Sequence, residues 1–102
     1  MAQRRQYIYI IEAGDFKHVK IGLSENPRRR VKQLQTGHHE RLHLAVATPG
    51  TSADEGRIHE ELSHARISGE WFDGSDSRVS RFICDMMSAS EWVESWNEQV
   101  FA

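Results

Sequence analysis

Two stretches near the N-terminus alternate apolar and polar positions with a period of two. Residues 6–12 are aromatic and β-branched, which is typical of a strand, and Tyr9 shares its face with the apolar residues two positions away on either side. Residues 18–23 put three apolar residues on one face and Lys20 with Gly22 on the other. Because a glycine-containing connection joins the two stretches, the pattern predicts a β-hairpin.

Apolar residues then recur with the roughly 3.6-residue period of a helix. Asn26 is a predicted N-cap, and Pro27 fits the first helical position, where its missing N–H costs no hydrogen bond. This helix is expected to run to about Gln35 and to end at Gly37. A third strand is expected over residues 42–48, where a Pro-Gly turn closes it.

The second half of the chain predicts mainly helices. One is expected over residues 51–66, and a short apolar segment follows at residues 69–74. Apolar positions at helical spacing predict two more helices, over residues 79–86 and 92–100. We expect a single domain over residues 1–102, of mixed α/β composition in the α+β class, with a small, mainly antiparallel three-stranded sheet flanked by helices.

The composition restricts the class of protein. With 102 residues, of which 38% are hydrophobic and 27% charged, the chain can build one modest core but not two, and it lacks the composition of a disordered protein. The longest apolar run, residues 7–11, is far shorter than the roughly 20 residues that cross a membrane. The polar start leads into no signal sequence, and the single cysteine, Cys84, can form no internal disulfide. We therefore expect a soluble, cytoplasmic protein with no membrane partner.

The net charge of −2 hides a strong asymmetry along the chain. Residues 1–43 carry nine Lys/Arg and four Asp/Glu, a net charge of +5, whereas residues 44–102 carry four and eleven, a net charge of −7. A basic half is an electrostatic signal for an anionic partner such as nucleic acid.

Four basic residues lie close together on the predicted first helix: Arg28, Arg29, Arg30 and Lys32. At about 100° per residue, Arg29 points to solvent, and Arg28 and Arg30 flank the buried side. Arg30 is placed to grip a phosphate with two parallel hydrogen bonds, and the group is a candidate nucleic-acid-binding patch. The alternative is a solvated basic face without a ligand.

Tyr9 and Lys20 lie on the two arms of the predicted hairpin. A phenol has a pKa of about 10, so it is a weak base on its own. A neighbouring ammonium favours the phenolate, and Lys20 is therefore expected to lower the pKa of Tyr9 and make it a general base. The structural alternative is that Tyr9 is an amphipathic sheet residue packed under a helix.

Glu55 and His59 are four positions apart on the predicted second helix and so share one face. A carboxylate on the core side of a helix needs a partner, and Mg²⁺ binds one or two carboxylates together with water and phosphate oxygens. The alternative is local, because Ser52 and Glu55 match a capping box. The other histidines show no spacing typical of a zinc site.

In order and spacing these residues resemble the GIY-YIG nuclease superfamily. The two tripeptides of its hairpin correspond to Tyr7-Ile8-Tyr9 and Lys20-Ile21-Gly22, with ten residues between them. Its helical arginine corresponds to Arg30, and its metal-binding glutamate to Glu55. The strings Lys-Ile-Gly, Glu-x-x-x-His and Gly-Glu-Trp-Phe are similar to those of a compact branch from phages and bacteria, in which lysine commonly replaces the tyrosine of the second tripeptide. The resemblance covers about residues 7–72.

The resemblance implies a metal-dependent endonuclease that hydrolyses phosphodiester bonds. In that role Tyr9 is the general base and Lys20 lowers its pKa, while Arg30 clamps the phosphate. Glu55 holds one Mg²⁺ or Mn²⁺ ion, and His59 orients the water or the metal shell. DNA is the expected substrate ahead of RNA, and a bacterium or phage is the expected source.

Two departures from the superfamily pattern leave a second interpretation open. Tyr7 stands in place of glycine in the first tripeptide and Lys20 in place of tyrosine in the second. The alternative is a catalytically silent module that binds nucleic acid or protein on the same fold. Glu70 and Trp71 belong to the branch signature, and we expect them to pack or to close the edge of the site. Residues 73–102 lie outside the resemblance and are a candidate surface for a homodimer or a protein partner.

Overall fold

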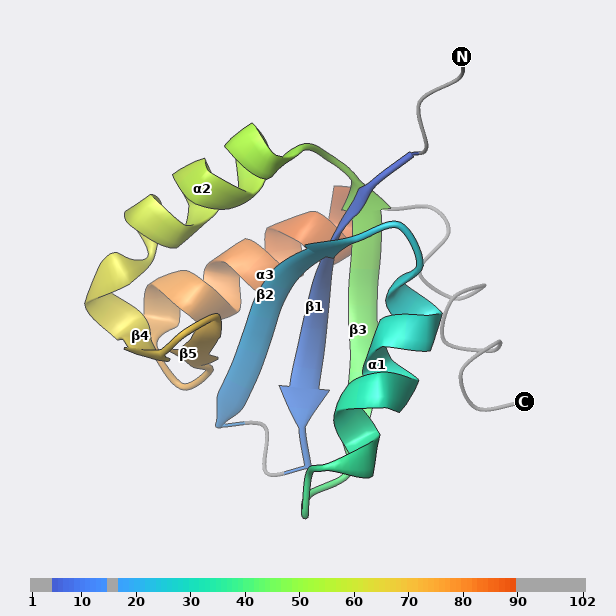
Figure 1. Cartoon of the computed structure of the whole chain (residues 1–102). Coiled ribbons are helices and arrows are strands. Elements are labelled where there is room, and N and C mark those ends of the chain that lie inside the picture. The colour runs from blue at the N-terminus through green and yellow to red at the C-terminus, as the bar shows by residue number, and fades with distance from the viewer. Residues whose placement is uncertain (1–4, 15–16, 90–102) are drawn as a thin grey trace.

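The computed structural model describes residues 5–14 and 17–89, which form an antiparallel five-stranded sheet with helices on both faces (Figure 1). In the order β3-β1-β2-β5-β4, the strands are β1 (Tyr7–Ala13), β2 (His18–Ser24), β3 (Leu42–Pro49), β4 (Arg66–Ser68) and β5 (Trp71–Asp73). The helices are α1 (Pro27–Thr36), α2 (Ser52–Glu61) and α3 (Ser77–Ala89), and a short 3₁₀ helix, Ser63–Ala65, follows α2. The predicted α+β class is confirmed. None of the described helices is long and apolar enough to cross a membrane.

The predicted hairpin and first helix are confirmed. β1 and β2 pair antiparallel, with Tyr9 opposite Gly22. The side chain of Asn26 caps α1 by accepting a hydrogen bond of 3.1 Å from the Arg29 N–H, and Pro27 is the first helical residue. Both features depend on residues that are close together in the chain, so the sequence alone predicts them.

The sheet has five strands, so the expectation of three was wrong. The second helix also ends at Glu61 rather than near residue 66, and the chain continues into β4 and β5. These strands are only three residues long, and Gly69, with a φ of 54°, turns the chain between them. Strands this short show no alternation that distinguishes them from a loop. The predicted helix over residues 92–100 lies outside the described residues.

The sheet is buried on both faces, which divides the core into two layers. On one face Tyr9 and Ile11 pack with Val31 of α1. On the other, Ile21 and Phe72 belong to a cluster that includes residues of α2 and α3. Side chains from neighbouring positions of β2 thus point into different layers, one under α1 and one under α2 and α3.

The sheet has a gap in its pairing beside the middle of β2. β5 pairs with β2 only from His18 to Lys20, which lies opposite Trp71. Beyond this point, the Ile21 N–H donates to the Glu70 carbonyl oxygen at 3.0 Å, and the strand pairing ends. We call this place, beside Ile21 and Gly22, the notch. Side chains from both layers can meet there.

Candidate active site

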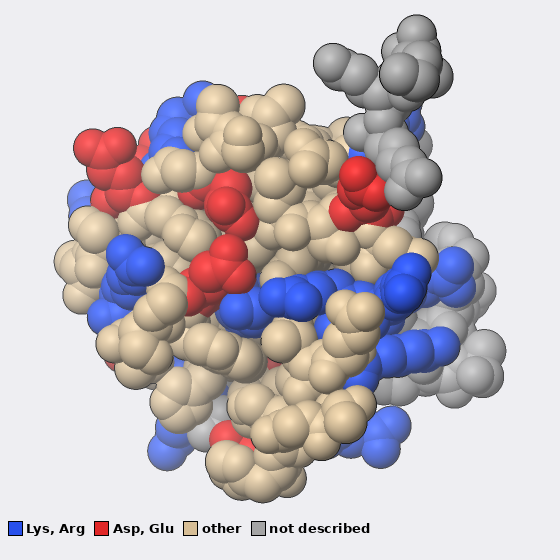
Figure 2. Space-filling view, viewed as in Figure 1, with Lys and Arg blue, Asp and Glu red and all other residues tan. Residues whose placement is uncertain are grey.

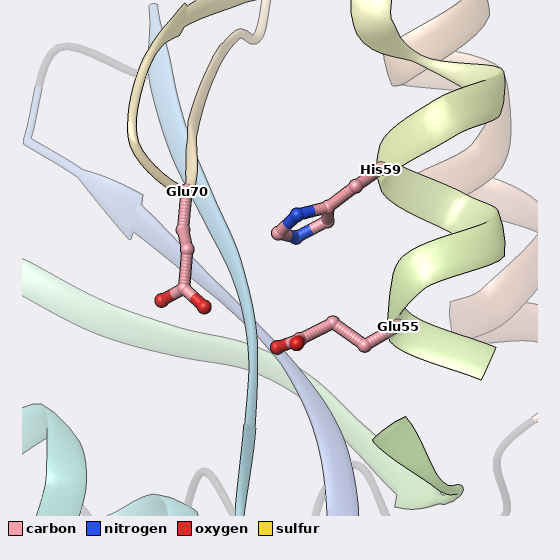
Figure 3. Close-up of side chains that lie close together, drawn as sticks. All are labelled: Glu55, His59 and Glu70. Atoms are coloured by element: carbon pink, nitrogen blue, oxygen red, sulfur yellow. The ribbon is translucent and has the colours of Figure 1, made fainter. Parts of the chain in front are cut away.

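Three side chains that can bind a metal ion converge at the notch (Figure 3). Glu55 and His59 project from successive turns of α2, and Glu70 comes from the turn that precedes β5. One ligand atom from each residue lies within 4.8 Å of the others. The structure therefore adds Glu70 to the predicted pair of Glu55 and His59. Glu70 was expected only to pack or to close the edge of the site. The signal in the sequence was its position directly after Gly69, at a turn.

The main chain of Ile21 orients two of these three residues. His59 Nε2 lies 2.7 Å from the Ile21 carbonyl oxygen. Because a carbonyl oxygen only accepts, Nε2 carries the proton, and in the neutral ring Nδ1 keeps its lone pair for a ligand. The Ile21 N–H holds the carbonyl of Glu70, as described above, and the ring of Phe72 meets the imidazole edge-on at 5.1 Å between centroids.

Glu55 does not cap α2. The N-cap is Thr51, whose hydroxyl accepts from the Asp54 N–H at 3.2 Å, while the Asp54 carboxylate accepts from the Thr51 N–H at 2.9 Å. The alternative, in which Ser52 and Glu55 form the capping box, is therefore excluded, and the box lies one position earlier. Because Asp54 has the capping role, the half-buried Glu55 side chain can face the notch.

The charges around Glu55 suit a divalent cation. Burial raises the pKa of the Glu55 carboxyl above its ordinary value of 4.5, the charge of Glu70 raises it further, and His59 opposes the shift. Two adjacent carboxylates repel each other, and a cation between them relieves the repulsion. Two carboxylates with one imidazole form a donor set that can hold a divalent metal ion.

Lys20 forms an ion pair with Glu70. Its Nζ lies 3.0 Å from Glu70 Oε1 and 5.6 Å from the centroid of the Trp71 ring. The residue is 8% exposed, so the ammonium is held between strands rather than in solvent. It offsets the charge of one of the two carboxylates at the notch.

The phenol of Tyr9 lies directly over Gly22. A Cβ at residue 22 would overlap the Tyr9 hydroxyl and come within 2.5 Å of Cζ, so glycine is the residue that leaves room for the ring. Burial raises the pKa of Tyr9 above its ordinary value of 10.0, a hydrogen bond with the Arg30 side chain opposes this, and the charges of Glu70 and Glu55 add to it. The Tyr9 side chain therefore combines buried packing with a polar contact at the notch.

The expectation that Lys20 lowers the pKa of Tyr9 was wrong. The pKa is raised, and the cation that opposes the rise is Arg30. The largest cause of the rise is burial of the phenol, and the Lys20 ammonium is paired with Glu70 instead. Arg30 reaches the phenol from α1, across the layer.

Basic side chains extend this site along α1. Arg28 is half-buried and Arg29 is exposed, as expected from the helical spacing, whereas Arg30, which was expected to flank the buried side, is exposed. Lys32 is exposed as well. In Figure 2, Lys and Arg side chains form a band over β2 and α1, and carboxylates lie at one end of the band. A band of several cations can neutralise several phosphates of a nucleic-acid backbone, which an isolated charge cannot do.

The structure thus brings together all five predicted catalytic residues around the notch: Tyr9, Lys20, Arg30, Glu55 and His59. Against known proteins, a family model described as the T5orf172 domain matches residues 6–97, a range that contains every residue of this site. No curated protein and no solved structure gives a significant match.

Proposed function

The chain belongs to the T5orf172 domain family, and we propose that it is a metal-dependent endonuclease of the GIY-YIG type. It hydrolyses phosphodiester bonds in nucleic acid, and the proposed substrate is DNA rather than RNA. The family itself is nuclease-associated. The observation that carries the proposal is the convergence of Glu55, His59 and Glu70 beside the contact between Tyr9 and Arg30. Carboxylates can hold a metal ion, a phenol can act as a base and a guanidinium can stabilise charge on a phosphate, and metal-assisted phosphodiester hydrolysis can use all three.

One divalent cation, Mg²⁺ or Mn²⁺, would be held by the carboxylates of Glu55 and Glu70 and by Nδ1 of His59, and it would supply Lewis-acid stabilisation of the negative charge on the phosphate. The hydrogen bond from His59 Nε2 to the Ile21 carbonyl supports this assignment, because it leaves Nδ1 as the lone-pair nitrogen.

Tyr9 is the proposed general base. In its phenolate form, Tyr9 would accept a proton from the attacking water while the water oxygen bonds to phosphorus and the leaving oxygen departs with the electron pair of the broken P–O bond. The raised pKa of Tyr9 means that the phenol is protonated until the charges around it change. Glu55 and Glu70 both raise this pKa through their charges, so neutralising those two carboxylates shifts the phenol toward its basic form.

Arg30 has two proposed tasks. Its guanidinium contacts the phenol of Tyr9 in the structure, and its exposed position on α1 lets it reach the non-bridging oxygens of a phosphate. Charge that develops on those oxygens in the transition state is stabilised by such a donor. Arg28, Arg29 and Lys32 are proposed to hold the flanking backbone.

The test is cleavage of supercoiled plasmid, single-stranded DNA and RNA by the purified protein in Mg²⁺ or Mn²⁺. We expect wild type to cut at least the DNA substrates and Tyr9→Phe, Arg30→Ala and Glu55→Gln to lose most of the activity. The matched control is Glu60→Gln, the same change at an exposed position of α2. Failure of wild type to cut any substrate, or full activity of Glu55→Gln, would refute the proposal.

One observation favours a second candidate, a nucleic-acid-binding module without catalysis. Lys20, which replaces the second tyrosine of the superfamily pattern, already pairs with Glu70 at 3.0 Å. In that case the ammonium takes the place of a cation at the notch. Binding of DNA that is unaffected by divalent ions, together with no cleavage, would support this candidate over the first.

A further inference from the structure

Three aromatic rings stack beside the candidate metal centre. The rings of Trp71 and His38 have centroids 5.6 Å apart and planes inclined by 28°, and those of His38 and His39 are 5.3 Å apart and inclined by 3°. Trp71 directly follows Glu70 and packs against the core under α1, whereas the His39 side chain is 89% exposed. The stack therefore runs from the buried edge of the site out to solvent.

The middle ring of the stack is held in place by the chain around it. The Glu40 N–H donates to His38 Nδ1 at 3.2 Å, and the Gln35 side chain donates to the His38 carbonyl oxygen at 3.3 Å. Glu40 lies in the short connection between α1 and β3, and Gln35 lies in the last turn of α1. A ring held in this way loses little further freedom when a ligand contacts it.

A hollow of about 240 Å³ opens against two of these rings. It is lined by His18, His38, Glu40, Ile67, Ser68 and Trp71. We call it the aromatic hollow. Ile67 is 51% exposed although it is apolar, so the hollow offers apolar and aromatic surface with a few polar groups at its margin. A flat heteroaromatic ring with a polar edge matches this lining better than an aliphatic or a charged ligand does.

Lys20 connects the aromatic hollow to the candidate metal centre. Its Nζ lies 3.0 Å from a carboxylate oxygen of Glu70 and 5.6 Å from the Trp71 ring, which lines the hollow. A phosphate at the metal centre and a base in the hollow would therefore flank the same ammonium. In a nucleic-acid strand each base is attached to a sugar that lies between two phosphates, so a phosphate and a neighbouring base can lie on either side of one ammonium.

We propose that the aromatic hollow binds one unpaired nucleobase of a DNA strand whose phosphate lies at the candidate metal centre. Only the position of that phosphate rests on the proposed function. Bases inside a duplex are stacked on their neighbours and paired, so a base reaches such a hollow only from single-stranded or locally opened DNA. The hollow thus selects this class of substrate, and stacking on Trp71 makes it tolerant of base identity, while His38, which is stacked between Trp71 and His39, contributes to the lining.

The test measures binding of a fluorescein-labelled thymidine oligonucleotide by fluorescence anisotropy in EDTA, where no cleavage occurs. The comparison strand has the same length and phosphates but carries abasic sites. We expect wild type to bind the intact strand at least about five-fold more tightly, as one base stacked on an aromatic side chain requires. This comparison needs no variant, so it does not depend on the folding of a mutant.

Two histidine variants locate the effect. His38→Ala should lose the preference for the intact strand, and His64→Ala, the same change at an exposed residue beside α3 that is not part of the hollow, should keep it. Equal binding of both strands by wild type, no detectable DNA binding, or equal behaviour of the two variants would overturn the proposal. If wild type cleaves DNA but shows no preference for the intact strand, only the proposal about the hollow is refuted. If wild type prefers the intact strand but cleaves no substrate, only the proposed function is refuted.

Discussion

Gly22→Ala tests whether the site depends on the close approach of Tyr9 to the backbone of β2. The added methyl group would overlap the Tyr9 hydroxyl and approach Cζ to 2.5 Å and Cε2 to 3.0 Å. Tyr9 is 1% exposed and packed under α1, so its ring cannot move away without displacing core residues. We expect the overpacking to lower the free energy of unfolding by about 1–3 kcal/mol and to displace the phenol from Arg30.

A second glycine provides the control. Gly56 lies in the exposed part of α2, and a Cβ there meets no atom within 4 Å. Gly56→Ala should therefore raise the free energy of unfolding by roughly 0.5–1 kcal/mol, because alanine favours the helix. The two substitutions add the same methyl group with opposite expected signs.

Thermal unfolding followed by circular dichroism measures the difference. Each kcal/mol corresponds to a change in Tm of roughly 4–8 °C for a domain of this size. In a Tyr9→Leu background, which removes the atoms that the new methyl group meets, Gly22→Ala should cost much less, and the coupling is read from the double-mutant cycle. A Tm for Gly22→Ala equal to that of wild type, or an unchanged cost in the Tyr9→Leu background, would refute the reasoning.

Three further predictions concern charges. In the absence of divalent ions, Lys20→Met should lower the free energy of unfolding by about 1–2 kcal/mol, because it leaves the partly buried Glu70 carboxylate without its ammonium partner. Urea denaturation in EDTA measures this change, and an unchanged denaturation midpoint would contradict the prediction. Hydrogen bonds from the Val79 N–H and from His64 hold the pKa of Asp76 below its ordinary value of 3.8, so its stabilising effect is complete above pH 3.8 and is lost as the pH falls through the lower value in the folded state. Wild type should accordingly lose its stability advantage over Asp76→Asn in denaturation at low pH, and a constant difference across this range would be inconsistent with that. Arg28→Ala and Lys32→Ala should each reduce the log–log salt dependence of DNA affinity by about one unit if each contacts a phosphate, whereas unchanged slopes would remove them from the interface.

Local signals in the sequence predicted the parts of the fold that local physics determines. Asn26 and Pro27 specify the start of α1 through a side-chain cap and a fixed φ, and the structure has both in those roles. Alternation predicted which residues of β2 share a face. The sequence left open whether Glu55 caps α2, because Ser52 with Glu55 matches a capping pattern as Thr51 with Asp54 does, and the sequence alone does not rank the two pairs.

The parts of the site that depend on tertiary pairing could not be predicted in the same way. Glu70 reaches the notch because the short β5 pairs with β2 in one register and because Ile21 binds the Glu70 carbonyl. The partner of Lys20 follows from the same register, since Glu70 lies next to Trp71, the residue opposite Lys20. As a result the lysine faces a carboxylate, and Arg30 rather than Lys20 contacts the phenol of Tyr9.

The central claim is that Glu55, His59 and Glu70 hold one divalent cation, and a titration with Mn²⁺ followed by electron paramagnetic resonance tests it most directly. The account predicts one bound ion per chain in wild type, a loss of affinity of at least about ten-fold in Glu55→Gln and Glu70→Gln, and unchanged binding in Glu61→Gln, an exposed glutamate at the end of α2. No bound Mn²⁺ in wild type, or equal binding by Glu55→Gln and Glu61→Gln, would contradict it.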